Sequence, residues 1–85
     1  MDTAPQPIWV RGEITLGQFL KLAGVAESGG HAKELIRDGE VTVNDAEERR
    51  RGRKLAPRDL VRVGTVTLVV EQRPTGAGEQ APNPR

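Results

Sequence analysis

Apolar residues recur with two different periods along this chain, and the first of them is helical. Residues 15–23 place apolar side chains at i, i+3, i+4 and i+7, namely Leu16, Phe19, Leu20 and Ala23. This spacing predicts a helix with one buried face. Thr15 followed by Gln18 is the sequence of a capping box, in which each side chain bonds the backbone amide of the other residue. We therefore expect the helix to begin directly after Thr15.

A second helix is predicted over residues 28–38. Ser28 is a suitable N-cap, Gly39 is a suitable terminator, and the intervening apolar stripe consists of Ala32, Leu35 and Ile36. Only residues 25–27 separate the two helices, so the pair must form a tight helical hairpin or corner.

After Gly39 the apolar period falls to two, which is typical of strands. Strands are expected at 41–43, from Glu47 into the following basic segment, at 60–63 and at 66–70, with a short additional one at 8–14. Turn residues separate them: Asn44-Asp45, Pro57-Arg58 and Gly64-Thr65. The sequence therefore predicts an α+β domain, with two helices followed by a small antiparallel β-sheet.

The two ends of the chain differ in composition from the segment between them. Residues 1–7 and 72–85 are rich in proline and poor in large apolar side chains, so we expect both to be disordered tails around one folded domain at 8–71. The chain has no cysteine and no apolar run that could span a membrane. We expect a monomeric cytoplasmic protein that makes no contact with membranes.

Positive charge is concentrated in one short segment. The formal net charge is only +1, yet residues 49–54 read RRRGRK. Such a run is either a solvated loop or a site for an anion, and lysine and arginine bind nucleic-acid phosphates by displacing counterions. In either case we expect the fold to survive replacement of the whole run.

Catalysis finds little support in the sequence. His31 is the only histidine, Ser28 is explained as an N-cap, and the acidic residues lack the spacing of a known metal loop. We therefore expect a protein without enzymatic activity, metal or cofactor. Trp9 and Phe19 are the only aromatic residues, which argues against a surface built to stack many bases.

Several of these segments together resemble a known module. Residues 15–20, 26–36, 39–44 and 57–61 match the order of helix, Ser-led helix with Leu-Ile, Gly-x-Val-x-Val-Asn and Asp-led strand. This order resembles the S-four-type RNA-binding domain, also called the αL motif, and its small stand-alone bacterial YaaA/YbcJ-like group. The resemblance spans residues 14–70.

The resemblance implies RNA binding through the second helix and the basic run. Ribosomal RNA is the implied target, with transfer RNA as an alternative and ribosomal proteins as further contacts. Lys21 on the first helix is a weaker candidate. Carried over by position, the implied RNA-binding residues are Ser28, Gly29, Gly30, His31, Lys33, Arg37, Arg49, Arg50, Arg51, Arg53 and Lys54.

Some family positions differ in this chain. Thr15-Leu16-Gly17 stands where many members have Arg-Leu-Asp, and Gly29 replaces an arginine. Either RNA affinity is weak, or the basic run has taken over these contacts. The glycines at 29 and 30 either let a phosphate approach bare amides at a helix N-terminus or merely permit the inter-helix corner.

A protein-interaction module is the rival hypothesis. In that case the basic run would bind an acidic partner, and the strands of residues 60–70 would offer a free sheet edge.

Overall fold

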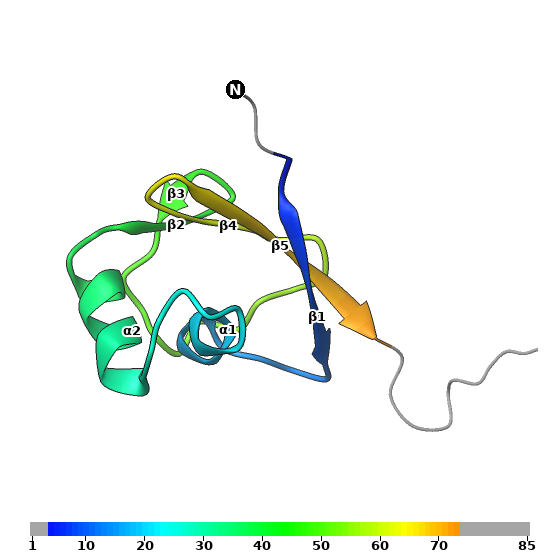
Figure 1. Ribbon diagram of the computed structural model, residues 1–85, viewed down its shortest axis with the longest axis horizontal. Coiled ribbons are helices and arrows are strands. Elements are labelled where there is room, and N and C mark those ends of the chain that lie inside the picture. Colours follow the sequence, from blue (N-terminus) through cyan, green and yellow to red (C-terminus); the bar gives the residue numbers. More distant parts are fainter. Residues whose placement is uncertain (1–3, 74–85) are drawn as a thin grey trace, which may run out of the picture.

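The computed structural model describes residues 4–73, which form two helices and a five-stranded sheet (Figure 1). The elements in chain order are β1 (Gln6–Arg11), α1 (Leu16–Leu22), α2 (Gly29–Arg37), β2 (Val41–Val43), β3 (Ala46–Glu47), β4 (Leu60–Val63) and β5 (Val66–Arg73). The predicted α+β class is thereby confirmed.

The sheet is mixed, whereas the sequence predicted an antiparallel one. Its strand order is β1-β5-β4-β2-β3, and β1 pairs in parallel with β5, with Ile8 opposite Val70. The remaining pairs are antiparallel. The segment from α1 to β4 lies between β1 and β5 in the chain, which is long enough for a parallel connection. Because β4 and β5 both lie inside the sheet, the expected free edge at residues 60–70 is wrong; the edges are β1 and β3.

Strand bounds differ from the predicted ones at three places. Strand β1 begins at Gln6 and ends at Arg11, where the sequence predicted 8–14. Because β5 also reaches Arg73, the folded part extends slightly beyond the expected limits 8 and 71. The rest of the expected tails, residues 1–3 and 74–85, lies outside the described residues. Strand β3 ends at Glu47, and the basic segment that follows is a loop.

Local signals set the helix ends as the sequence predicts. The amide of Gln18 donates to Thr15 Oγ1 at 3.4 Å and the amide of Thr15 donates to Gln18 Oε1 at 3.0 Å, which completes the capping box of α1. Ser28 Oγ accepts from the amide of His31 at 3.1 Å at the start of α2. Asn44 and Asp45 have φ values of 54° and 72°, as a two-residue hairpin turn requires.

The core lies between the two helices and one face of the sheet (Figure 1). Alternate strand residues point inward, and the helices contribute the stripes that their spacing predicts. The buried set is Val10, Leu16, Phe19, Leu20, Ala26, Ala32, Ile36, Val41, Val43, Val61, Val63, Leu68 and Val70. Neither of the two helices within residues 4–73 covers the opposite face of the sheet, so the outward side chains of β1, β5 and β4 are not covered by a helix of this part of the chain.

Candidate nucleic-acid interface

The basic segment forms a loop that packs against the start of α1. Leu16 N–H donates to the carbonyl of Arg53 at 2.8 Å, and Gly17 N–H donates to the carbonyl of Arg51 at 3.1 Å. Lys54 forms an isolated β-bridge with Thr15. These bonds satisfy amides that a helix cannot satisfy internally. The N-terminus of α1 is therefore occupied by the protein's own backbone, and the loop has a fixed shape.

The buried carboxylate of Glu48 pairs with two arginines of the loop. The residue is only 7% exposed, and it is the one buried charged residue in the described part of the chain. Its carboxylate accepts from Arg50 Nε at 3.0 Å and from Arg53 Nη1 at 2.8 Å, and also from the amide of Arg50 at 3.1 Å. Hydrogen bonds from Arg50 and then from Arg53 lower the pKa of Glu48 from 4.5 to about 2.

Two other cations of the run are also paired internally. Arg49 bonds Glu47 at 2.8 Å and donates to the carbonyl of Arg37 at 3.2 Å, which joins the loop to the end of α2. Lys54 lies 3.6 Å from the exposed carboxylate of Glu13. Four of the five basic side chains therefore have a carboxylate partner.

These contacts argue against the prediction that the fold survives replacement of the whole run. Replacing all five cations would leave the Glu48 carboxylate buried without a guanidinium partner. A fivefold variant that loses RNA binding would therefore not distinguish a lost contact from a lost fold.

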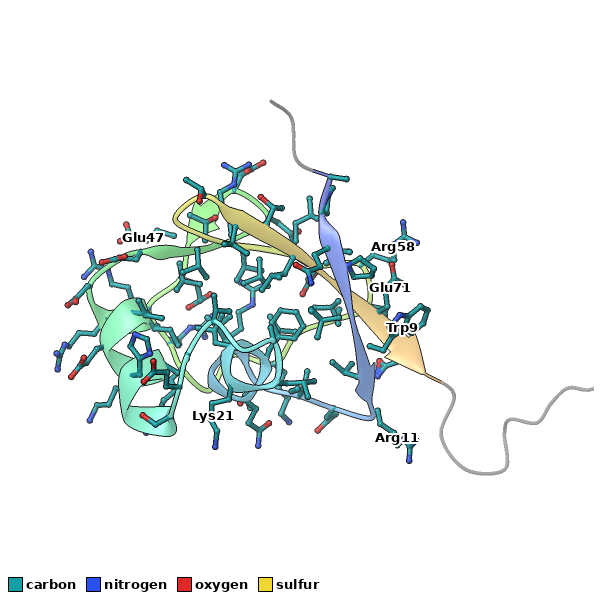
Figure 2. All side chains as sticks on the ribbon, in the orientation of Figure 1. Trp9, Arg11, Lys21, Glu47, Arg58 and Glu71 are labelled. Atoms are coloured by element: carbon teal, nitrogen blue, oxygen red, sulfur yellow. The ribbon has the colours of Figure 1, made fainter. Side chains whose placement is uncertain are left out.

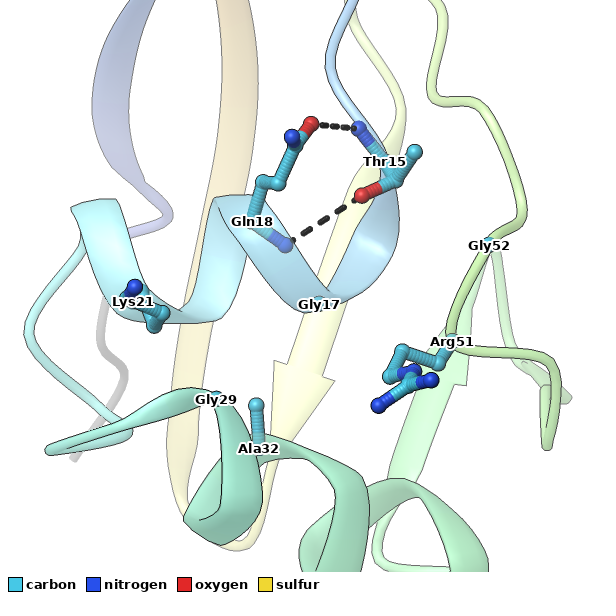
Figure 3. A pocket seen from close by; sticks show the side chains of 8 residues that line it. All are labelled: Thr15, Gly17, Gln18, Lys21, Gly29, Ala32, Arg51 and Gly52. Atoms are coloured by element: carbon cyan, nitrogen blue, oxygen red, sulfur yellow. Dashed lines mark hydrogen bonds between the residues drawn. The ribbon is translucent and has the colours of Figure 1, made fainter.

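Arg51 is the exception within the run. It makes no ion pair with any described residue, and its side chain extends towards the gap between the helices (Figure 3). An open pocket of about 270 Å³ lies there, with Lys21 of α1 at its other side. The pocket combines small residues with polar ones and is lined by Thr15, Gly17, Gln18, Lys21, Gly29, Ala32, Arg51 and Gly52. Two cations, Lys21 and Arg51, therefore line this pocket together with small residues.

The absence of a side chain at Gly17 leaves room for the Arg51 side chain. A Cβ at residue 17 would lie 2.8 Å from Arg51 Cγ, closer than such atoms approach. Cγ is near the root of the side chain, so the whole arginine would have to take another rotamer. The glycine that departs from the family pattern is thus the residue that admits the arginine of the loop.

We expect Gly17→Ala to lower RNA affinity about threefold to tenfold without unfolding the domain. The variant moves the Arg51 guanidinium away from Lys21, while alanine gains up to about 1 kcal/mol of helix propensity over glycine, which offsets the strain. Gly30→Ala is the matched control, since Gly30 holds the equivalent second position of α2 and an added Cβ meets only Ser28 Oγ at 3.9 Å. An affinity of Gly17→Ala equal to that of the native chain in a gel-shift titration would contradict this role.

The residues predicted on α2 divide into structural and exposed ones. Ser28 caps the helix, and His31 Nδ1 accepts from the amide of Glu27 at 3.0 Å, so both side chains fix the inter-helix corner. Gly29 lines the pocket, and Gly30 does not. Lys33 and Arg37 are exposed and follow Gly29 at successive intervals of four, so they lie along one side of α2. Arg37 Nε lies 3.9 Å from the exposed carboxylate of Asp38.

Other kinds of site find no support among residues 4–73. Neither helix there is long and apolar enough to cross a bilayer. The same residues contain no cluster of three His, Asp or Glu side chains that could hold a metal ion. Neither the pairing of Glu48 with Arg50 and Arg53 nor the close approach of Arg51 to Gly17 was predicted from the sequence. Glu48 lies in an acidic run directly before the basic one, which is a signal of internal pairing.

Comparison with known proteins agrees with the geometry. The chain is 58% identical over 50 residues to the probable ribosome maturation protein RlbA of Bacillus subtilis (strain 168), a match that covers 59% of this chain and 70% of that protein. The crystal structure of 30S ribosomal protein S4e from Thermoplasma acidophilum superposes with a TM-score of 0.50 at 17% identity. That likeness covers 65% of this chain and only 29% of S4e, and it concerns the fold alone. The family model of the S4 domain matches residues 10–71, and the chain therefore belongs to the S4 domain family.

Proposed function

We propose that this protein binds structured RNA without catalysing a reaction, and that the pocket between α1, α2 and the basic loop is its main contact. The observation that carries the proposal is Arg51, a guanidinium that has no carboxylate partner among residues 4–73 and that lines the same pocket as Lys21 in an S4-family fold. Lys33 and Arg37 extend the same charge along α2. Together they form a basic surface that is suited to several phosphates of a folded RNA.

Ribosomal RNA is the proposed target, during maturation of the ribosome in the cytoplasm. The support is the name of the similar Bacillus protein, a probable ribosome maturation protein, and the membership in the S4 family. Transfer RNA is the alternative ligand, and ribosomal proteins are further contacts. Recognition is by backbone charge and shape, because the pocket offers cations and backbone but no aromatic ring.

The rival protein-interaction hypothesis is less well supported. An acidic partner would have to displace Glu47, Glu48 and Glu13 from cations that they already hold. Only Arg51 of the run is available without such an exchange, and it lies in a pocket and not on a flat surface.

The test is crosslinking to RNA in cells, followed by sequencing of the attached RNA, for the native chain and for Arg51→Gln. We expect a defined peak on ribosomal RNA that falls about tenfold in the variant, since one phosphate contact is lost. Arg62→Gln on β4 is the control for loss of one exposed charge, and its peak should persist. A peak that is equally strong in both variants, or an acidic protein recovered in place of RNA, would contradict the proposal.

A further inference from the structure

A second group of chemically active side chains lies on the opposite side of the molecule, on the sheet face that neither α1 nor α2 covers. Trp9 of β1 is 51% exposed, and its partner across the parallel ladder is Glu71 of β5. Arg58 Nε lies 3.9 Å from Glu71 Oε2. Figure 2 shows these three side chains together beside β1 and β5, with Arg11 further along β1. We call Trp9, Arg11, Arg58 and Glu71 the Trp9 patch.

Strand alternation explains why these residues share one face. Val10 and Val70 are buried against the helices, so their neighbours Trp9 and Glu71 point the other way. Arg11 follows Trp9 by two positions and therefore lies on the same face, about 6.6 Å along the strand. The patch combines one large ring with two guanidinium groups and one carboxylate, so its net charge is positive.

The strained backbone of Arg58 is an independent indication that its side chain is functional. Arg58 has a φ of +76° at the third position of the turn 56–59, which the Asp59 N–H to Ala56 carbonyl bond of 3.1 Å closes. Glycine is the residue that such a turn favours, because a Cβ is strained at this φ. The turn holds an arginine at the expense of stability. Strained positions of this kind concentrate at functional sites.

We propose that the Trp9 patch is a second RNA site, where an unpaired base stacks on the indole of Trp9 and its adjoining phosphates bind Arg58 and Arg11. Every base offers a face for stacking, and arginines beside the ring supply the phosphate contacts. The low aromatic content of the chain limits this site to one base, because Phe19 is buried in the core. Two basic sites on opposite faces would let the protein contact two segments of one folded RNA.

A protein partner fits this patch less well. The usual protein contact at a sheet edge is an added strand, and β1 is the edge here. Pro7 within β1 has no N–H to donate to such a strand, which makes this edge a poor template. The net positive charge favours a polyanion.

Trp9 is the only tryptophan of the chain, so its fluorescence reports on this site directly. The experiment titrates single-stranded hexa-adenylate into the full chain at low salt. We expect quenching in the native protein and equally in the Lys21→Gln, Arg51→Gln double variant, whose pocket is disabled. Arg58→Gly should weaken the quenching by fivefold or more and raise the thermal midpoint by about 2–5 °C, since the backbone strain is removed. Arg62→Gln, on the same sheet, should quench like the native protein.

Each other outcome overturns the second site. The absence of quenching does so, as does quenching by polyglutamate in place of RNA. Quenching that disappears in the pocket variant would mean that Trp9 senses binding elsewhere. A thermal midpoint of Arg58→Gly below that of the native protein would show that the arginine stabilises the turn and has a structural role. None of these results bears on the pocket, whose role rests on structured RNA and Arg51.

Discussion

Glu48→Gln should lower the free energy of unfolding by about 2–3 kcal/mol at pH 7, the largest effect on stability expected of any single change in the loop. The substitution keeps the shape of the side chain but removes the charge that Arg50 and Arg53 both contact, at 3.0 and 2.8 Å. Breaking a fully buried ion pair lowers the free energy of unfolding by more than this. Arg50 is itself largely exposed, so water replaces part of its contact with Glu48. Urea unfolding followed by circular dichroism measures the difference.

The same carboxylate makes this stability depend on pH, and the sign follows from its lowered pKa. Folding holds the pKa of Glu48 at about 2 against an ordinary value of 4.5. A lowered pKa means that the charged form favours the fold, so this contribution is complete above about pH 4.5 and disappears as pH falls towards 2. We expect the native protein and Glu48→Gln to differ in stability at pH 7 and to converge near pH 2.

Glu13→Gln is the matched control, because Glu13 pairs with Lys54 at 3.6 Å on the open surface. Its unfolding should stay close to that of the native protein at every pH. A Glu48→Gln variant as stable as the native protein at pH 7 would show that the loop does not need its internal carboxylate. In that case the fivefold basic variant would become a clean test of RNA binding after all.

Replacing Lys21 and Arg51 together with glutamine should weaken binding to structured ribosomal RNA about 60-fold at 0.1 M salt. Each phosphate contact contributes close to 0.9 to the slope of log affinity against log salt, so two contacts contribute roughly 1.8 log units at that concentration. The slope should become shallower by the same amount, and the affinities of the two proteins should converge towards 1 M salt. Filter binding over a salt series measures both quantities.

The fold should be unaffected by this double change, because neither cation has a carboxylate partner among the described residues. Lys54→Gln combined with Arg62→Gln removes the same charge outside the pocket and is the matched control. If the control lost as much affinity as the pocket variant, net charge and not the pocket would account for binding. An unchanged salt slope in the pocket variant would also contradict a phosphate contact there.

Local sequence determined the helices and turns of this protein. Thr15 with Gln18 and Ser28 set the helix starts, and Asn44-Asp45 set the hairpin, because capping and turn formation involve residues a few positions apart. The apolar periods also gave the buried faces. The family resemblance, by contrast, implied that Ser28 and His31 contact RNA; in the structure both side chains bond the neighbouring backbone.

The sequence showed where the positive charge lies, but not which of the cations are already paired with a carboxylate. From residues 49–54 alone, all five cations are equivalent, and only the folded chain separates Arg51 from the four that face Glu13, Glu47 and Glu48. Gly17, likewise, is an ordinary helix glycine until the loop brings Arg51 against it.

Short-range patterns in the sequence therefore predicted the helices and strands, the α+β class and the family resemblance. The parallel pairing of β1 with β5 joins residues 62 positions apart, from Gln6 with Leu68 to Arg11 with Arg73, and no local signal specifies it. Tertiary packing alone forms the pocket between α1, α2 and the loop. It also forms the Trp9 patch on the other face. Both arise where segments that are distant in the chain pack together, because burial of the common core fixes which exposed side chains become neighbours.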